Sequence, residues 1–166
     1  MNDSTSAAMF SDGREWLRNH RHTYLSSGGS KGHLINLTFS GGHGFSPHLL
    51  LRCIGRNSGK VYINPLFYGI IGGEVAIVAS KGGADVHPDW YLNLIARDDI
   101  TFQIGTQAFR GTWREPRGSE RDAAWNFMVG NNPSFVKYQA STSRLIPIVL
   151  LRMIEEIPTF TEHTSD

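Results

Sequence analysis

Two short basic turns hold the residue types in this sequence that best suit the binding of an anion. The first, GRNSGK at residues 55 to 60, brings Arg56, Ser58 and Lys60 together on a loop whose glycines leave backbone amides accessible. Guanidinium and ammonium groups form charge-assisted hydrogen bonds to phosphate or carboxylate, and a concave run of amides adds to them. The turn lacks the glycine spacing of a Walker P-loop. The competing interpretation is a hairpin tip with ordinary solvated basic residues.

The second turn, SKGG at residues 80 to 83, follows an apolar strand and comes shortly before a helix expected from Pro88. The free amides and the dipole of a helix N-terminus favour anions, so two features that attract negative charge lie within a few residues. This arrangement predicts an anion near Lys81. The alternative is a surface lysine followed by a plain glycine turn.

Other chemistries find no support in residue spacing. His20 and His22 are two apart and point to different faces of a helix, while His33, His43 and His48 lie in a glycine-rich segment without an HExxH or paired CxxC pattern. No GxSxG elbow is present, and no cysteine has an assignable histidine partner. Neither a metal site nor covalent catalysis is therefore predicted.

An aromatic segment, NNPSFVKYQ at residues 131 to 139, places Phe135 and Tyr138 three positions apart on an expected helical turn. These rings could anchor a loop to the core. They could instead line a pocket for a flat, apolar substrate, with the Tyr138 phenol as its polar contact.

The elements that must position these residues follow from hydrophobic periodicity and turn signals. We expect a fold that is mainly β (α+β), an antiparallel barrel with helices outside, because several strands are interrupted by a mid-chain helix without βαβ alternation. In chain order the expected parts are a disordered tail (1–8), a single domain (9–157) and a second tail (158–166). The domain is expected to begin with a helix (9–25) capped by Ser11 or Asp12, followed by a Gly/Ser-rich connection (26–47) whose patch 34–39 is a strand or a loop. Next come three strands (48–80), a helix (88–97) and two strands (100–105, 108–115). The domain then closes with a helix (119–130) capped by Ser119 or Gly118 and a final strand extended by a helical turn or tail (144–157).

Composition narrows the class of protein further. The net charge is +1, so the broad positive field of a nucleic-acid binder is missing. The single cysteine, Cys53, cannot form an intramolecular disulfide, and no apolar run is long enough to span a membrane. We expect a cytoplasmic protein with no transmembrane segment and no nucleic-acid partner.

Three ordered motifs, GRNSGKxxxxPLxY, VASKGGAxxxPxWYLNL and YQAxTxRxIPIVLL, cover most of the chain between about residues 14 and 152. Together they resemble the deazaflavin (F420)-dependent nitroreductase family of small split β-barrel oxidoreductases. The resemblance implies coenzyme F420 as the cofactor and hydride transfer to a small hydrophobic or aromatic electron-poor substrate, namely a nitro compound, a quinone or an enone. A homodimer is also expected.

Residue roles follow from the same resemblance. The implied catalytic hydroxyls are Ser80 and Tyr138. The implied cofactor-binding residues are Arg56, Asn57, Ser58, Gly59, Lys60, Pro65, Ala79, Ser80, Lys81, Gly82, Gly83, Pro88, Trp90 and Asn93. The implied substrate-binding residues are Phe67, Tyr68, Asn132, Phe135 and Tyr138.

The chain departs from the family pattern at two positions. Asn57 and Tyr62 stand where relatives usually carry basic residues. Losing two charged contacts would cost on the order of 3 kcal/mol, roughly a hundredfold in affinity for a polyanionic tail. Two alternatives stay open for this reason: the shorter cofactor FMN, and a non-catalytic barrel that binds an apolar ligand such as a fatty acid or a steroid.

Overall fold

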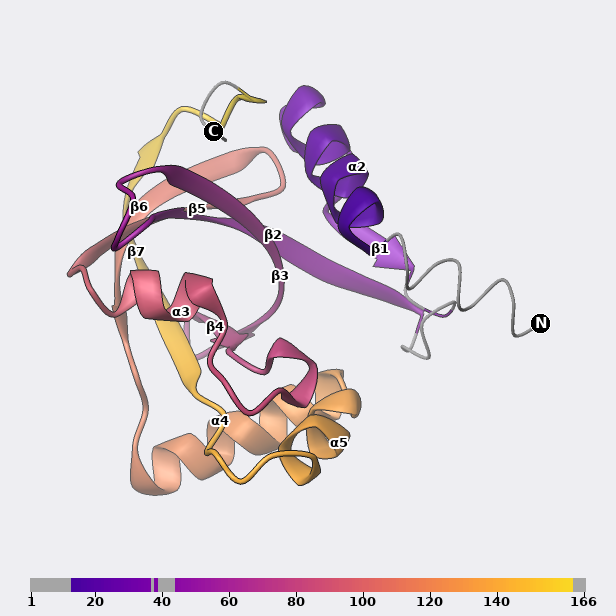
Figure 1. Ribbon diagram of the computed structural model, residues 1–166. Coiled ribbons are helices and arrows are strands. Elements are labelled where there is room, and N and C mark those ends of the chain that lie inside the picture. The colour runs from indigo at the N-terminus through magenta and orange to yellow at the C-terminus, as the bar shows by residue number, and fades with distance from the viewer. Residues whose placement is uncertain (1–12, 37, 39–43, 163–166) are drawn as a thin grey trace.

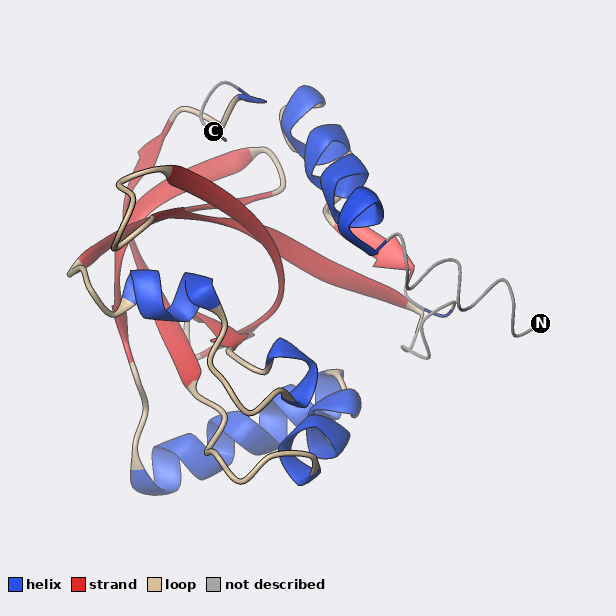
Figure 2. Cartoon of the chain, viewed as in Figure 1, coloured by secondary structure: helices blue, strands red, loops and turns tan. Residues whose placement is uncertain are grey.

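The computed structural model describes residues 13–36, 38 and 44–162, and its helices and strands follow one another as Figures 1 and 2 show. In chain order these are α2 (Gly13–Ser26), β1 (Leu34–Asn36), β2 (Phe45–Ile54), β3 (Val61–Ile71), β4 (Glu74–Val78), the 3₁₀ turn η2 (Lys81–Gly83), α3 (Asp89–Leu94), β5 (Asp99–Ile104), β6 (Gln107–Arg114), α4 (Gly118–Asn131), α5 (Ser134–Ala140) and β7 (Ile148–Ile157).

The strands form an antiparallel barrel. The sheet runs in the order β1-β2-β3-β4-β7-β6-β5, and an additional pairing of β5 with β2 closes the ring. Short turns connect β2 to β3, β3 to β4 and β5 to β6, while β1 pairs only with the first residues of β2. Figure 1 shows α4 and α5 together at one end of the barrel and α2 beside β1 at another. The expected mainly β barrel with outer helices is confirmed.

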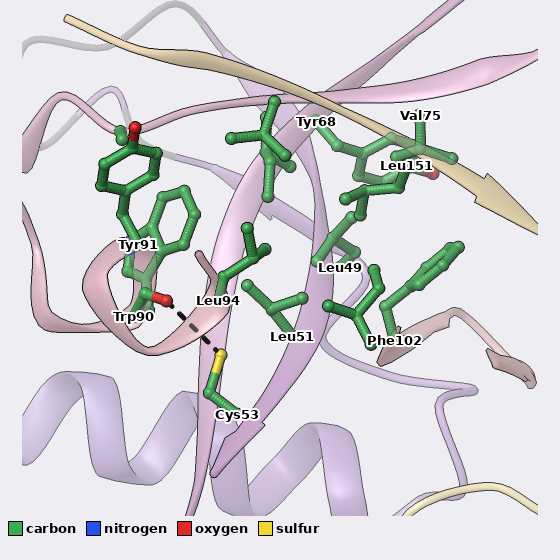
Figure 3. Packing of buried hydrophobic residues seen from close by; sticks show 14 residues of the cluster. Leu49, Leu51, Cys53, Tyr68, Val75, Trp90, Tyr91, Leu94, Phe102 and Leu151 are labelled. Atoms are coloured by element: carbon green, nitrogen blue, oxygen red, sulfur yellow. Dashed lines mark hydrogen bonds between the residues drawn. The ribbon is translucent and has the colours of Figure 1, made fainter. Parts of the chain in front are cut away.

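Side chains alternate across the barrel wall, and this alternation decides what each turn can reach. Along β3, Leu66 and Tyr68 join the cluster inside the barrel, whereas Phe67 and Ile71 join the cluster under α4 and α5. Figure 3 shows the interior cluster, where Trp90 and Leu94 of α3 pack beside Leu51. The short helix α3 therefore belongs to the barrel core.

Helix α4 packs closely on the outer face of the sheet. Gly69 of β3 makes room for it, because a Cβ there would lie 3.0 Å from Sδ of Met128 and 3.1 Å from the ring of Phe127. On another side of the barrel, Tyr24 and Leu25 of α2 are buried against Leu50 and Ile63. The N-terminal helix is thus part of the folded domain.

Several expected boundaries need correction. The last element is strand throughout, with no helical turn, because β7 pairs with β4 at its start and with β6 as far as Ile157. Helix α3 ends at Leu94, three residues before the expected end at residue 97, and Ile95 just beyond it is 43% exposed. Arg117, neither Ser119 nor Gly118, occupies the N-cap of α4, without a side-chain cap.

Of the two interpretations left open for the patch 34–39, the strand is confirmed over Leu34–Asn36, which form β1. Phe160, inside the expected C-terminal tail, is only 4% exposed, and its amide donates to Oε1 of Gln103 at 2.7 Å. The expected N-terminal tail, the helix start at Met9 and its caps Ser11 and Asp12 lie outside the described residues. Among the helices that the structure describes, none has the length and apolar character needed to cross a bilayer.

Candidate active site

The SKGG turn adopts a backbone conformation that gathers amide groups. Ser80 is right-handed (φ −77°, ψ −37°), and Lys81, Gly82 and Gly83 follow with φ of 47°, 62° and 84°. A right-handed residue followed by a left-handed one turns successive N–H groups toward a common point, the nest that binds anions in many proteins. Lys81 is the one described non-glycine residue with positive φ, so this turn carries strain that glycine would avoid.

Three amides of the turn are available to a ligand. The N–H groups of Ser80, Lys81 and Gly82 make no hydrogen bond within the described part of the chain, whereas Gly83 N–H donates to Ser80 O at 2.9 Å. Lys81 is exposed, and its ammonium pairs with no carboxylate among the described residues. The turn therefore combines three amides that have no partner in the described chain with one exposed cation.

The turn rests on α5, which carries the predicted Tyr138. A Cβ on Gly83 would lie 2.1 Å from Oγ of Ser141, 2.7 Å from O of Tyr138 and 2.9 Å from Cα of Tyr138. Glycine is therefore required at position 83. The Ser141 hydroxyl also donates to Gly83 O at 3.2 Å. The structure thus brings two predicted regions together, SKGG and the Tyr138 helix.

Arg144 is the residue near the turn that the sequence did not assign a role. Its guanidinium donates to Ala79 O at 3.2 Å, Ser80 O at 2.7 Å and Ala84 O at 2.7 Å. The signal in the sequence was an arginine inside the YQASTSRLIP motif, but no spacing rule shows that its partners are backbone carbonyls about sixty residues away.

The GRNSGK turn borders a separate pocket with a volume of about 420 Å³. Arg56, Asn57 and Ser58 line it together with Trp90 and Asn93 of α3, as predicted. The remaining lining residues are Gly55, Tyr62, Asn64 and Asp89.

Arg56 is already engaged at this pocket. Its backbone N–H and its Nη1 both donate to Oδ1 of Asn93, at 3.1 and 2.8 Å, and its Nη2 lies 3.4 Å from Oδ1 of Asp89. Asn64 adds an Nδ2 group that is buried without a partner in the described chain. The arginine that borders this pocket is therefore partly neutralised by Asp89.

Some predicted cofactor residues do not line this pocket. Lys60 is exposed, and its amide donates to Oγ of Ser58 at 3.2 Å. Gly59 supplies the positive φ of 71° that the turn needs. Pro65 lies within β3 opposite Leu50, and Pro88 is the N-cap of α3.

The predicted substrate residues do not lie together, because Phe67 and Tyr68 of β3 face opposite sides of the sheet. The rings of Phe67 and Phe135 are 5.8 Å apart, and Tyr138 lies 6.2 Å from Phe135, so three of the five form one aromatic cluster. Tyr68 points into the barrel instead, where its hydroxyl lies 2.6 Å from Nε2 of His33. Asn132 ends α4, and its Oδ1 accepts from Ser134 N–H at 3.2 Å.

Buried histidines beside this cluster are uncharged at neutral pH. Burial lowers the pKa of His48 to about 4, and its ring lies 6.2 Å from that of Phe67. Burial also lowers the pKa of His20, whose ring is 6.0 Å from His48. Neither imidazole therefore brings positive charge to the neighbourhood of Phe67, which suits a flat apolar molecule more than an anion.

The thiol of Cys53 and the possible metal ligands of the described chain do not form a reactive centre. Burial raises the pKa of the Cys53 thiol to about 12, and this thiol lies 3.7 Å from Trp90 O inside the barrel (Figure 3), which argues against a nucleophile. Among the residues that the structure describes, no group of three or more His, Cys, Asp or Glu side chains is placed to hold a metal ion.

Comparison with known proteins gives consistent matches. Residues 16–153 match the family model of F420H(2)-dependent quinone reductases. An F420H(2)-dependent quinone reductase of Mycobacterium tuberculosis is 34% identical over 142 residues, which is 84% of this chain and 91% of the relative.

Solved structures agree with the barrel. A structure described as a domain-swapped dimer has a TM-score of 0.61 and 32% identity, over 84% of this chain and 99% of its own. A structure of an F420-H2 dependent reductase (FDR-A) has a TM-score of 0.58 and 37% identity, over 64% of this chain and 94% of its own.

Proposed function

This chain belongs to the F420H(2)-dependent quinone reductase family, and on that basis we propose that it transfers a hydride from reduced F420 to a quinone-like acceptor. The resemblance inferred from the three motifs is thereby confirmed at the level of the family. The observation that carries the proposal is the SKGG turn, where three amides have no partner in the described chain and Lys81 is exposed, beside the helix that bears Phe135 and Tyr138. An electron-rich cofactor needs this combination of a cationic cradle and an adjacent apolar surface.

The residues present fit such a cofactor. The nest at Ser80, Lys81 and Gly82 would hold a negatively charged part of it, and the pocket at Arg56, Asn57 and Ser58 would receive an extended polar tail. Reduced F420 supplies a hydride when it is bound. Lys81 stabilises negative charge that develops beside it, because an ammonium in place before the reaction needs no reorganisation. No observation favours FMN over F420.

The acceptor would lie on the aromatic cluster. Phe67 and Tyr138, both partly exposed, provide the flat apolar surface with the buried ring of Phe135 packed behind them, and the hydroxyls of Tyr138 and Ser80 are the proposed proton donors. A quinone that gains a hydride also needs a proton on its carbonyl oxygen, so one hydroxyl near the turn is sufficient. The relatives are named for quinone reduction, and a nitro compound or an enone would make the same demand for a flat surface and a proton. Nothing favours the non-catalytic ligand binder.

We also propose that the chain forms a homodimer. The support is the structural neighbour described as a domain-swapped dimer, which this chain covers almost completely. Light scattering after size-exclusion chromatography measures this directly. A monomer at micromolar concentration would contradict the proposal.

The catalytic proposal is tested by turnover with chemically reduced F420 and a small naphthoquinone such as menadione. We expect wild-type protein to oxidise the cofactor only when the quinone is present. Lys81→Ala should lower kcat/KM for the cofactor about tenfold or more, because a charge-assisted contact contributes about 1.5–3 kcal/mol. Lys137→Ala, which removes an exposed lysine from α5, is the matched control. Wild-type protein without turnover on any quinone, nitro compound or enone would refute the proposal.

A further inference from the structure

Arg144 lies in the connection between α5 and β7, and its side chain contacts the turn that precedes α3. Nε donates to Ala84 O at 2.7 Å, and Nη2 donates to Ser80 O at 2.7 Å. Nη1 lies 3.2 Å from Ala79 O and 3.1 Å from Nδ1 of His87. Arginine has only donors, so Nδ1 of His87 accepts this contact. All three guanidinium nitrogens are therefore directed at residues 79–87.

These contacts fix the direction of two amides of the nest. In a planar trans peptide the C=O of one residue and the N–H of the next point in opposite directions. Because Ala79 O and Ser80 O face Arg144, the N–H groups of Ser80 and Lys81 face away from it. They make no hydrogen bond in the described chain and thus point toward the side where an anion would bind.

The conformation that Arg144 holds is one that the backbone would otherwise leave. A left-handed lysine costs about 1–2 kcal/mol, and such residues persist when their surroundings over-determine them. At this turn the surroundings are the Arg144 fork at Ala79, Ser80 and Ala84 and the Ser141 hydroxyl at Gly83 O. Both come from the segment after Tyr138, far from the turn in sequence.

We infer that Arg144 is the positioning residue of the anion site: it binds the carbonyl side of the SKGG turn so that the amides of Ser80 and Lys81 are presented to the cofactor. The inference rests on the proposed function, since the anion in question belongs to F420. Arg144 acts through the turn and does not itself contact the cofactor. Lysine is a poor substitute, because one ammonium on a flexible stem cannot reproduce a planar fork that reaches three carbonyls.

The test compares Arg144→Lys with a matched change, Arg121→Lys. Arg121 is also partly buried and donates to Ile146 O at 2.8 Å in the same connection, but neither this hydrogen bond nor its cation–π contact with Trp125 reaches the SKGG turn. We expect Arg144→Lys to raise the Kd of F420, measured by fluorescence titration, at least tenfold, with Arg121→Lys within twofold of wild type. The two variants should have similar values of KM for the quinone and similar thermal midpoints. If Arg144→Lys caused a general loss of structure, its values would differ from those of Arg121→Lys.

Chemical rescue gives a second readout. In Arg144→Ala, added guanidinium ion at millimolar concentration should restore part of the lost F420 affinity, while sodium chloride of equal ionic strength should not. An Arg144→Lys variant with wild-type affinity, or an Arg144→Ala variant insensitive to guanidinium, would overturn the inference.

Failure of the proposed function is recognisable separately, because wild-type protein would then bind no F420. In that case the amide resonances of Ser80 and Lys81 decide the role of Arg144. Large shifts of both resonances in Arg144→Lys, absent in Arg121→Lys, would support it, and unchanged resonances would overturn it.

Discussion

The two basic turns that flank α3 present their cations in opposite ways. At the β2–β3 turn, Arg56 is bound to Asn93 and lies 3.4 Å from the carboxylate of Asp89. At the SKGG turn, Lys81 extends from a left-handed backbone beside amides that have no partner in the described chain, while Arg144 holds the carbonyls behind it. The cation of the β2–β3 turn is thus paired within the protein, whereas Lys81 is exposed and has no carboxylate partner in the described chain.

This difference separates two tasks that the sequence alone cannot separate. Arg56 braces α3 through Asn93 and borders a pocket, whereas Lys81 and its amides form the anion site that we propose. The missing cations at Asn57 and Tyr62 lie on the side of Arg56. Their absence therefore weakens the tail pocket and leaves the SKGG turn intact.

The largest expected effect comes from Gly83→Ala. The new Cβ would overlap Ser141 and the backbone of Tyr138, and the residue would keep a φ of 84°. Left-handed strain and overpacking together predict a loss of about 2–5 kcal/mol in unfolding free energy and loss of F420 binding. Denaturant unfolding measures the first quantity and fluorescence titration the second. Gly82→Ala meets open space at φ 62° and should cost only about 1–2 kcal/mol; equal costs would contradict the packing of the turn on α5.

Asn93→Ala should have the next largest effect. Asn93 is only 6% exposed, and its Oδ1 accepts both the backbone N–H and the Nη1 of Arg56. Removing an acceptor from a partly buried turn costs about 1–3 kcal/mol. We expect this loss in thermal or denaturant unfolding, with a smaller change in F420 affinity than Lys81→Ala produces. A stability equal to that of wild type would show that Arg56 does not brace α3.

Asn57→Lys should strengthen cofactor binding. The substitution returns a cation to an exposed position on the wall of the pocket proposed for the cofactor tail, where an exposed ion pair adds about 0.2–1 kcal/mol, roughly 1.4- to fivefold in affinity. The gain should fade as salt is raised, since surface charges are screened within about 10 Å at 0.1 M ionic strength. Titrations of F420 at low and high salt measure it, and no gain at low salt would mean that the tail does not reach this turn.

Asp89→Asn should produce the smallest change. Its side chain is 80% exposed and lies 3.4 Å from Arg56, so the ion pair contributes at most a few tenths of a kcal/mol to stability. Removing the carboxylate frees Arg56 and should raise F420 affinity slightly, less than Asn57→Lys does. A large loss of affinity would assign Asp89 a direct role in binding.

The fold was predictable to the extent that it depends on local pattern. The β2–β3–β4 meander, the helix after Pro88 and the pair β5–β6 follow from alternation and turn residues. The closing pair of β5 with β2 is nonlocal, and no spacing rule gives it. The prediction of a helical turn at the end of β7 was wrong, because RMIEEI has a helical composition but pairing with β6 overrides that propensity.

The candidate site was predictable in its parts and less so in its arrangement. The two turns and the ring pair of Phe135 and Tyr138 were visible as motifs. That Phe67 and Tyr68 face opposite sides follows from strand alternation, a constraint that the family-based assignment of both to one substrate site overlooked. Arg144 and Asn93 bind backbone groups that are distant in sequence, and the type of a residue does not predict which backbone group it will bind.

The most direct test of the account is one fluorescence titration series with F420 on wild type, Lys81→Ala and Arg56→Ala. The account predicts that Lys81→Ala raises Kd about tenfold or more, as expected for a lost charge-assisted contact, and that Arg56→Ala raises it less because Arg56 is already paired within the protein. A larger loss for Arg56→Ala than for Lys81→Ala, or an unchanged Kd for Lys81→Ala, would contradict the placement of the cofactor's negative charge at the SKGG turn.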